Sequence, residues 1–173
     1  GAVVKIDKDA EFYGPVISLG TGNEGKIYGP VVSLVSINNE KTYGANVSVI
    51  GVNESKGKTY GANVSLASEN KGKTYGANVS LASENKGEIN GLDVSILFSL
   101  VSGGEYNGIK LSLFSSHTGG KINGLEGALL CNFNDRTDAN LVKDTEVNGL
   151  QFSLFYNRAK AGNVAQFGLI NKI

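Results

Sequence analysis

The sequence has no methionine, no tryptophan, two prolines, one histidine and one cysteine among its 173 residues. With Cys131 alone an internal disulfide is excluded, and His117 has no second histidine or cysteine pair with which to hold zinc. Lysine plus arginine equal aspartate plus glutamate at 16 each, so no net charge attracts a nucleic acid or an acidic membrane. No run reaches the roughly 18 apolar residues of a spanning helix, which argues against membrane insertion.

The absence of methionine also bears on the N-terminus, because the chain begins at Gly1. We expect that end to be the product of processing. Removal of a signal peptide agrees better with the rest of the chain than cleavage of a tag does, since the composition looks extracellular.

What the sequence does have is glycine, with 24 residues, and a repeat that spaces them. Lys58 to Gly72 reads KTYGANVSLASENKG, and Lys73 to Gly87 repeats it letter for letter. Weaker copies follow one another about every 15 to 17 residues, with one longer insertion. Each copy is anchored by a glycine after Tyr or Asn, and the last has Val164 there; the anchors are Gly14, Gly29, Gly44, Gly61, Gly76, Gly91, Gly108, Gly124 and Gly149.

Side chains alternate after each anchor. In the copy after Gly61, apolar Ala62, Val64 and Leu66 alternate with polar Asn63 and Ser65. A period of two predicts a strand with one buried face. We expect the apolar positions one, three and five after the anchor to point inward and the polar positions two and four to point outward, because a charged side chain is costly in a small apolar core.

These features predict a single all-β domain over residues 1–173, a β-solenoid (β-helix) of about ten coils with a 15–17 residue period. Recurrence of the same residue in the same place favours stacked parallel coils. The alternative is an antiparallel β-meander or barrel, in which every second strand runs the other way. A membrane barrel needs about 9 to 11 residues per strand and aromatic girdles, which the early copies lack.

The second half resembles a known kind of repeat. Residues 148–157 (NGLQFSLFYN) and 166–171 (QFGLIN) are similar to the N-G-L-Q-[IF]-G-L-[IV]-N units of bacterial surface-repeat proteins, with looser matches over residues 88–173. The first half shares the period alone. The resemblance implies an exported or surface location in bacteria and implies no catalytic residues.

Two candidate contact regions emerge. The first is an outward line of small hydroxyls, which would suit a flat contact face, formed by Ser18, Ser33, Ser48, Ser65, Ser80, Ser95, Ser112 and Ser153. The second is the charged insertion at 132–146, which we expect to protrude as a recognition loop through Asp135, Arg136, Asp138, Lys143 and Asp144.

No residues are arranged for catalysis, so we expect no enzyme, no cofactor and no metal. We expect His117 in a solvated turn and Cys131 as a buried thiol. The sequence favours an extracellular or bacterial cell-surface structural protein, a subunit that builds or decorates a filament by end-to-end self-association into a homo-oligomer or fibre. The alternative is an adhesin or fibre-type binding module with a cell-surface or glycan ligand.

Overall fold

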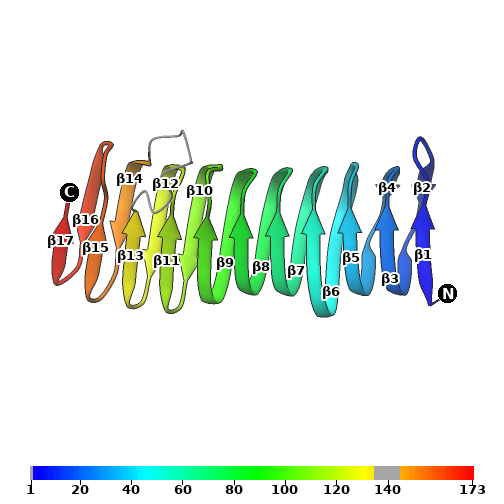
Figure 1. The fold of residues 1–173 in the computed structure, drawn as a ribbon, viewed down its shortest axis with the longest axis horizontal. Helices are drawn as coiled ribbons and strands as arrows, with labels where there is room; N and C mark the ends of the chain where they lie inside the picture. The colour runs from blue at the N-terminus through cyan, green and yellow to red at the C-terminus, as the bar shows by residue number, and fades with distance from the viewer. Residues whose placement is uncertain (1, 135–144) are drawn as a thin grey trace.

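The computed structural model describes residues 2–134 and 145–173, and for residues 49–55 it describes the backbone alone. This part of the chain is all-β and winds into a β-solenoid of about ten coils, with the N-terminal coil at one end of the stack and the C-terminal coil at the other (Figure 1). Every strand pairing in it is parallel. The solenoid prediction is therefore confirmed, and the antiparallel alternative is wrong.

Each coil contributes a longer and a shorter β-segment, which stack separately as a long face and a short face. The long face contains β2 (Glu11–Tyr13), β4 (Lys26–Tyr28), β10 (Glu105–Ser112), β12 (Lys121–Ala128), β14 (Glu146–Phe152) and β16 (Val164–Phe167). The short face contains β1 (Val3–Ile6), β11 (Ser115–Thr118), β13 (Cys131–Asn134), β15 (Tyr156–Arg158) and β17 (Ile170–Lys172). The remaining strands run through both faces: β3 (Val16–Asn23), β5 (Val31–Asn38), β6 (Thr42–Ser55), β7 (Lys58–Asn70), β8 (Lys73–Asn85) and β9 (Glu88–Val101).

The anchor glycines stack on one another, as the repeat predicts. Gly61 pairs with Gly76 and Gly76 with Gly91, and in the last coil Val164 pairs with Gly149. The anchors have φ between 124° and 149°, a region that side-chain-bearing residues rarely adopt. A Cβ built on Gly76 would also overlap the carbonyl oxygen of Gly61 in the coil before it. Glycine is thus required twice over at this bend.

The side chains point the opposite way from the prediction. Asn63 and Ser65 are 1% and 8% exposed, whereas Val64 and Leu66 are 40% and 43% exposed. The polar columns two and four after the anchor line the interior, and the apolar columns three and five lie outside. Strict alternation predicts that the polar and apolar sets lie on opposite faces of the strand. It does not predict which of the two faces the coil turns toward its interior.

Stacking gives some of the interior polar side chains partners one coil away. Asn132 Nδ2 donates to Asn157 Oδ1 at 2.9 Å, and Asn157 Nδ2 donates to Asn171 Oδ1 at 2.9 Å. Such amide ladders satisfy groups whose burial otherwise costs free energy. Buried apolar residues form two described clusters, one of Ile6, Val16, Ile27 and Val31 and the other of Ile89, Tyr106, Ile122, Val147 and Ala159. Val101 and Ala128 are buried apart from them.

Candidate functional site

The interior contains charged side chains that the sequence analysis placed outside. The Glu126 side chain is fully buried two residues after the anchor Gly124. Its Oε1 accepts hydrogen bonds from Ser116 (2.5 Å) and Thr118 (3.0 Å), and its Oε2 accepts from Asn134 (2.7 Å) and Gln151 (3.0 Å). A buried carboxylate with this many donors is well solvated by the protein.

Lys110, one coil earlier in the same column, is also fully buried and forms an ion pair with Glu126 at 3.4 Å. Its Nζ also donates to Thr118 Oγ1 at 2.9 Å and to the His117 carbonyl at 3.1 Å. The three donors of the ammonium therefore each have an acceptor.

A second buried carboxylate, Asp93, precedes Lys110 in the column. Its Oδ1 accepts from Asn78 at 2.7 Å, and its Oδ2 accepts from Ser99, Ser83 and Asn85 at 2.7, 3.0 and 3.1 Å. The side chains two residues after the anchor thus run negative, positive, negative over three coils. This order links the coils through electrostatics as well as through the backbone.

Burial lowers the pKa of Lys110 from its ordinary value of 10.5, against the opposing effect of the Glu126 and Asp93 carboxylates. Between the lowered pKa and 10.5, the unfolded chain binds more protons at this residue than the folded chain does. The contribution of Lys110 to the free energy of unfolding is therefore expected to rise with pH over that interval. Urea unfolding at a series of pH values should show this rise in the wild type and its loss in Lys110→Met. Equal pH dependence in both proteins would mean that Lys110 titrates at its ordinary pKa.

These charged groups do not make a site for chemistry, because they are closed off from solvent. The described residues contain no group of three or more His, Cys, Asp or Glu side chains that could hold a metal ion. His117 lies in β11 with its ring 5.8 Å from that of Phe133, so its placement in a turn is wrong. Cys131 begins β13 as a half-buried free thiol, less buried than expected.

The outer surface of the described coils exposes many large apolar side chains. Two columns of exposed apolar side chains run along the stack, one three residues and the other five residues after each anchor. The first includes Ile17, Val64, Phe152 and Phe167, and the second includes Leu19, Leu66, Ile96, Leu113, Leu154 and Leu169. Further exposed apolar side chains lie at the start of the short face. Phe98 and Ile170 share one register column, and Phe114, Leu130 and Phe155 each directly precede the short strand of their coil. Contiguous apolar surface of this kind is typical of interaction sites.

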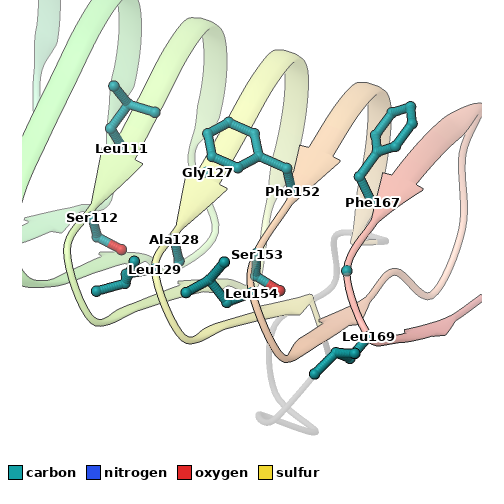
Figure 2. A pocket seen from close by; sticks show the side chains of 11 residues that line it. Leu111, Ser112, Gly127, Ala128, Leu129, Phe152, Ser153, Leu154, Phe167 and Leu169 are labelled. Atoms are coloured by element: carbon teal, nitrogen blue, oxygen red, sulfur yellow. The ribbon is translucent and has the colours of Figure 1, made fainter.

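The outer surface is hollowed between coils seven and ten, where the side chains of Figure 2 line a groove. A groove of about 610 Å³ lies between two apolar walls, with a second hollow of about 330 Å³ beside it toward the middle of the stack. One wall contains Leu111, Phe152 and Phe167, and the other contains Leu129, Leu154 and Leu169. Gly127 has no side chain, and the ring of Phe152 lies where a Cβ at this position would be.

The serine column forms the floor of this groove instead of an outer face. Ser112 and Ser153 lie between the two walls, flanked by Ala128 and Gly168 in the same column (Figure 2). All of the serines are buried except Ser18, which is half-buried. The predicted flat contact face of Ser18, Ser33, Ser48, Ser65, Ser80, Ser95, Ser112 and Ser153 is therefore wrong, because these side chains turn inward with the polar columns.

The other predicted region lies outside the described residues. Asp135, Arg136, Asp138, Lys143 and Asp144 all belong to the stretch 135–144, so the recognition loop stays a prediction.

Both ends of the described stack are open. No described strand pairs with the outer side of β1 at one end or of β16 and β17 at the other. On these sides the backbone N–H and C=O groups of the outermost described strands bond to no described strand, and such an edge can recruit a further strand.

Comparisons with protein families, curated proteins and solved structures find no match to this chain. Within the described residues, no helix is long and apolar enough to cross a membrane. The unpaired outermost strands and the apolar outer surface are therefore the features from which a function can be inferred.

Proposed function

We propose that this chain is an exported structural protein whose solenoid builds or decorates a bacterial surface filament by end-to-end association. The observation that carries the proposal is the open rung at each end of the described stack. The similarity of residues 88–173 to bacterial surface-repeat units supports the location. The balance of 16 basic and 16 acidic residues means that no net charge opposes packing of one copy on another. The proposal assigns no catalytic activity to the chain.

The two ends present matching columns. Following the register from coil to coil, Phe167 of the last rung occupies the same column as Ile17 near the first. Ile170 of β17 likewise shares a column with Val3 of β1. All four side chains are exposed. A copy stacked with its β1 on β17 in register would therefore place Val3 on Ile170 while the backbone ladder of the short face continued.

One backbone group at the N-terminal edge can be removed selectively. The carbonyls of Ala2 and Ile6 accept hydrogen bonds from Gly20 and Glu24, so these two residues face the stack. Because the N–H and C=O groups of successive residues point to opposite sides of a strand, Lys5 faces the open side. A proline at Lys5 would remove a donor from the open edge and leave the ladder to β3 intact.

We expect wild-type protein to form long filaments in negative-stain electron micrographs. Lys5→Pro should abolish them or shorten them several-fold. The matched control Lys5→Ala should leave filament length unchanged, because it removes the same exposed side chain and its ion pair with Asp7 but keeps the N–H. A monodisperse wild-type monomer at high concentration would count against the proposal, as would equal filament length in the two variants.

The apolar groove favours a second candidate function, an adhesin or fibre-type binding module. Grooves of 300–1,000 Å³ with apolar walls are typical of ligand sites, and the volume here is about 610 Å³. A cell-surface or glycan ligand bound by protein that forms no filaments would favour this alternative.

A further inference from the structure

Five tyrosines form a continuous row on the outside of the first five coils. Tyr13, Tyr28, Tyr43, Tyr60 and Tyr75 each precede an anchor glycine, so the register places them in one column. Successive ring centroids lie 4.7, 4.8, 4.9 and 5.1 Å apart, and the ring planes differ by only 3° to 8°. Phenol rings held in this way are neighbours for a reaction as well as for packing.

The row is accessible from solvent. Tyr13 is 69% exposed, Tyr60 and Tyr75 are exposed, and Tyr28 and Tyr43 are half-buried. The hydroxyl of Tyr13 donates to Glu11 Oε2 at 2.9 Å, so a carboxylate stands ready to take the phenol proton. The same carboxyl group accepts from Lys26 Nζ at 2.7 Å, which keeps it ionised.

We propose that this tyrosine row is a site of oxidative cross-linking, at which a peroxidase-type one-electron oxidant supplied with hydrogen peroxide joins tyrosines of neighbouring coils as dityrosine. The oxidant takes one electron from each of two stacked rings, and each phenol releases its proton. A carbon–carbon bond then forms between the ring carbons next to the hydroxyls, and the hydrogens on those carbons return to the oxygens as the rings regain aromaticity. The two electrons and two protons reduce one hydrogen peroxide to two waters.

Stacking favours this coupling because it makes the encounter of the two rings intramolecular. Reacting atoms need to come within about 3–3.5 Å, so the rings must tilt together from their centroid spacing. The exposure of Tyr13, Tyr60 and Tyr75 leaves these rings room for such motion. The resulting bond would staple one coil to the next through side chains, in addition to the backbone ladder.

The remaining two tyrosines serve as internal controls. Tyr106 is buried and its hydroxyl donates to the Ile109 carbonyl at 2.6 Å. Tyr156 packs beside Phe133, with ring centroids 5.4 Å apart and planes tilted by 38°. Neither ring is stacked on another tyrosine in the described residues, so neither should couple.

The test is to treat the folded protein with peroxidase and hydrogen peroxide, isolate the monomer band under denaturing conditions and map its cross-links by tryptic mass spectrometry. Cleavage at Lys26, Lys41 and Lys56 puts Tyr13, Tyr28 and Tyr43 on peptides of distinct sequence. Tyr60 and Tyr75 lie on peptides of identical sequence (59–71 and 74–86), so a link to either is counted as a link to this pair. We expect links only between peptides from neighbouring coils. Each linked pair should be lighter than the sum of its two peptides by two hydrogen atoms and should show dityrosine fluorescence. The yield should exceed that of urea-unfolded protein by about ten-fold or more, because the stack fixes the partners.

The variant Tyr28→Phe keeps a ring in the row but removes a hydroxyl. It should lose the Tyr13–Tyr28 and Tyr28–Tyr43 links and retain those from Tyr43 to Tyr75. Links that involve Tyr106 or non-neighbouring tyrosines, an equal yield in urea, or an unchanged link pattern in Tyr28→Phe would each overturn the proposal. The result does not depend on filament formation, because it is read on the monomer.

Discussion

Replacing Gly76 by alanine is expected to unfold the middle of the solenoid. The residue has φ of +140°, where a Cβ costs about 1–2 kcal/mol, and the added methyl would overlap the carbonyl oxygen of Gly61. The overlap involves backbone on both sides, so it is relieved only if the two coils move apart and lose ladder hydrogen bonds. We expect a loss of more than about 4 kcal/mol in the free energy of unfolding, measured by urea denaturation followed by circular dichroism.

Alanine substitutions at two other glycines distinguish the cost of the positive φ from the cost of the steric overlap. Gly14 shares the positive φ (+124°) but has no atom within 4 Å of a built Cβ, so Gly14→Ala should cost only the backbone term of about 1–2 kcal/mol. Gly22 has neither a positive φ nor a nearby atom, and Gly22→Ala should change stability by less than about 0.5 kcal/mol. Equal losses in the three variants would contradict the close contact between glycines of successive coils.

Lys110→Met is expected to destabilise the protein by about 3–5 kcal/mol. The substitution preserves most of the side-chain volume but leaves the Glu126 carboxylate buried without its cation. The double variant Lys110→Met/Glu126→Gln should recover stability to within about 1–2 kcal/mol of the wild type, because it removes both charges and keeps an amide to bond the surrounding groups. Urea denaturation of the two variants and the wild type gives the comparison.

The matched control is an ion pair of the same type on the surface. Lys121 lies 3.5 Å from Glu146, and both side chains are partly exposed. Lys121→Met should therefore change the free energy of unfolding by less than about 1 kcal/mol. If Lys110→Met were as mild as this control, or the double variant no more stable than the single one, the buried ion pair would not be holding the coils together.

The architecture followed from the sequence because the repeat carries positional information. The two identical segments that begin at Lys58 and Lys73 predict that equal residues stack, and the structure pairs them residue for residue. The substitution of Val164 for an anchor glycine was also found from the period alone, and it pairs with Gly149 as expected. Parallel stacking is the arrangement that keeps such columns aligned in every coil.

The sequence did not reveal which columns lie inside. A charged side chain such as Lys110 is costly to bury in an apolar interior, but the interior of this solenoid is largely polar. Asp93 and Glu126 occupy the same column in the coils before and after Lys110, and this alternation of charge was a usable signal of a buried polar network. Hydrogen bonds such as that from Asn78 to Asp93 then supply partners that a single coil does not contain.

The groove was missed for the same reason, since it needs the apolar columns outside. Its floor of Ser112 and Ser153 was singled out as a line of small side chains, but it was assigned to the wrong face. Gly127 interrupts an otherwise apolar column, and its missing side chain leaves room for the ring of Phe152 in the groove wall. The tyrosine row, by contrast, follows directly from the period once stacking is established.

An interior of asparagine, serine and threonine also affects how the protein responds to temperature. Unfolding such a solenoid exposes mostly polar groups, because many of its large apolar side chains already contact water. Hydration of polar groups lowers the heat capacity change of unfolding, which in ordinary domains is about 12–15 cal/mol/K per residue. The free energy of unfolding should accordingly vary little with temperature. Cooling should lower it far less than it does in a protein with an apolar core.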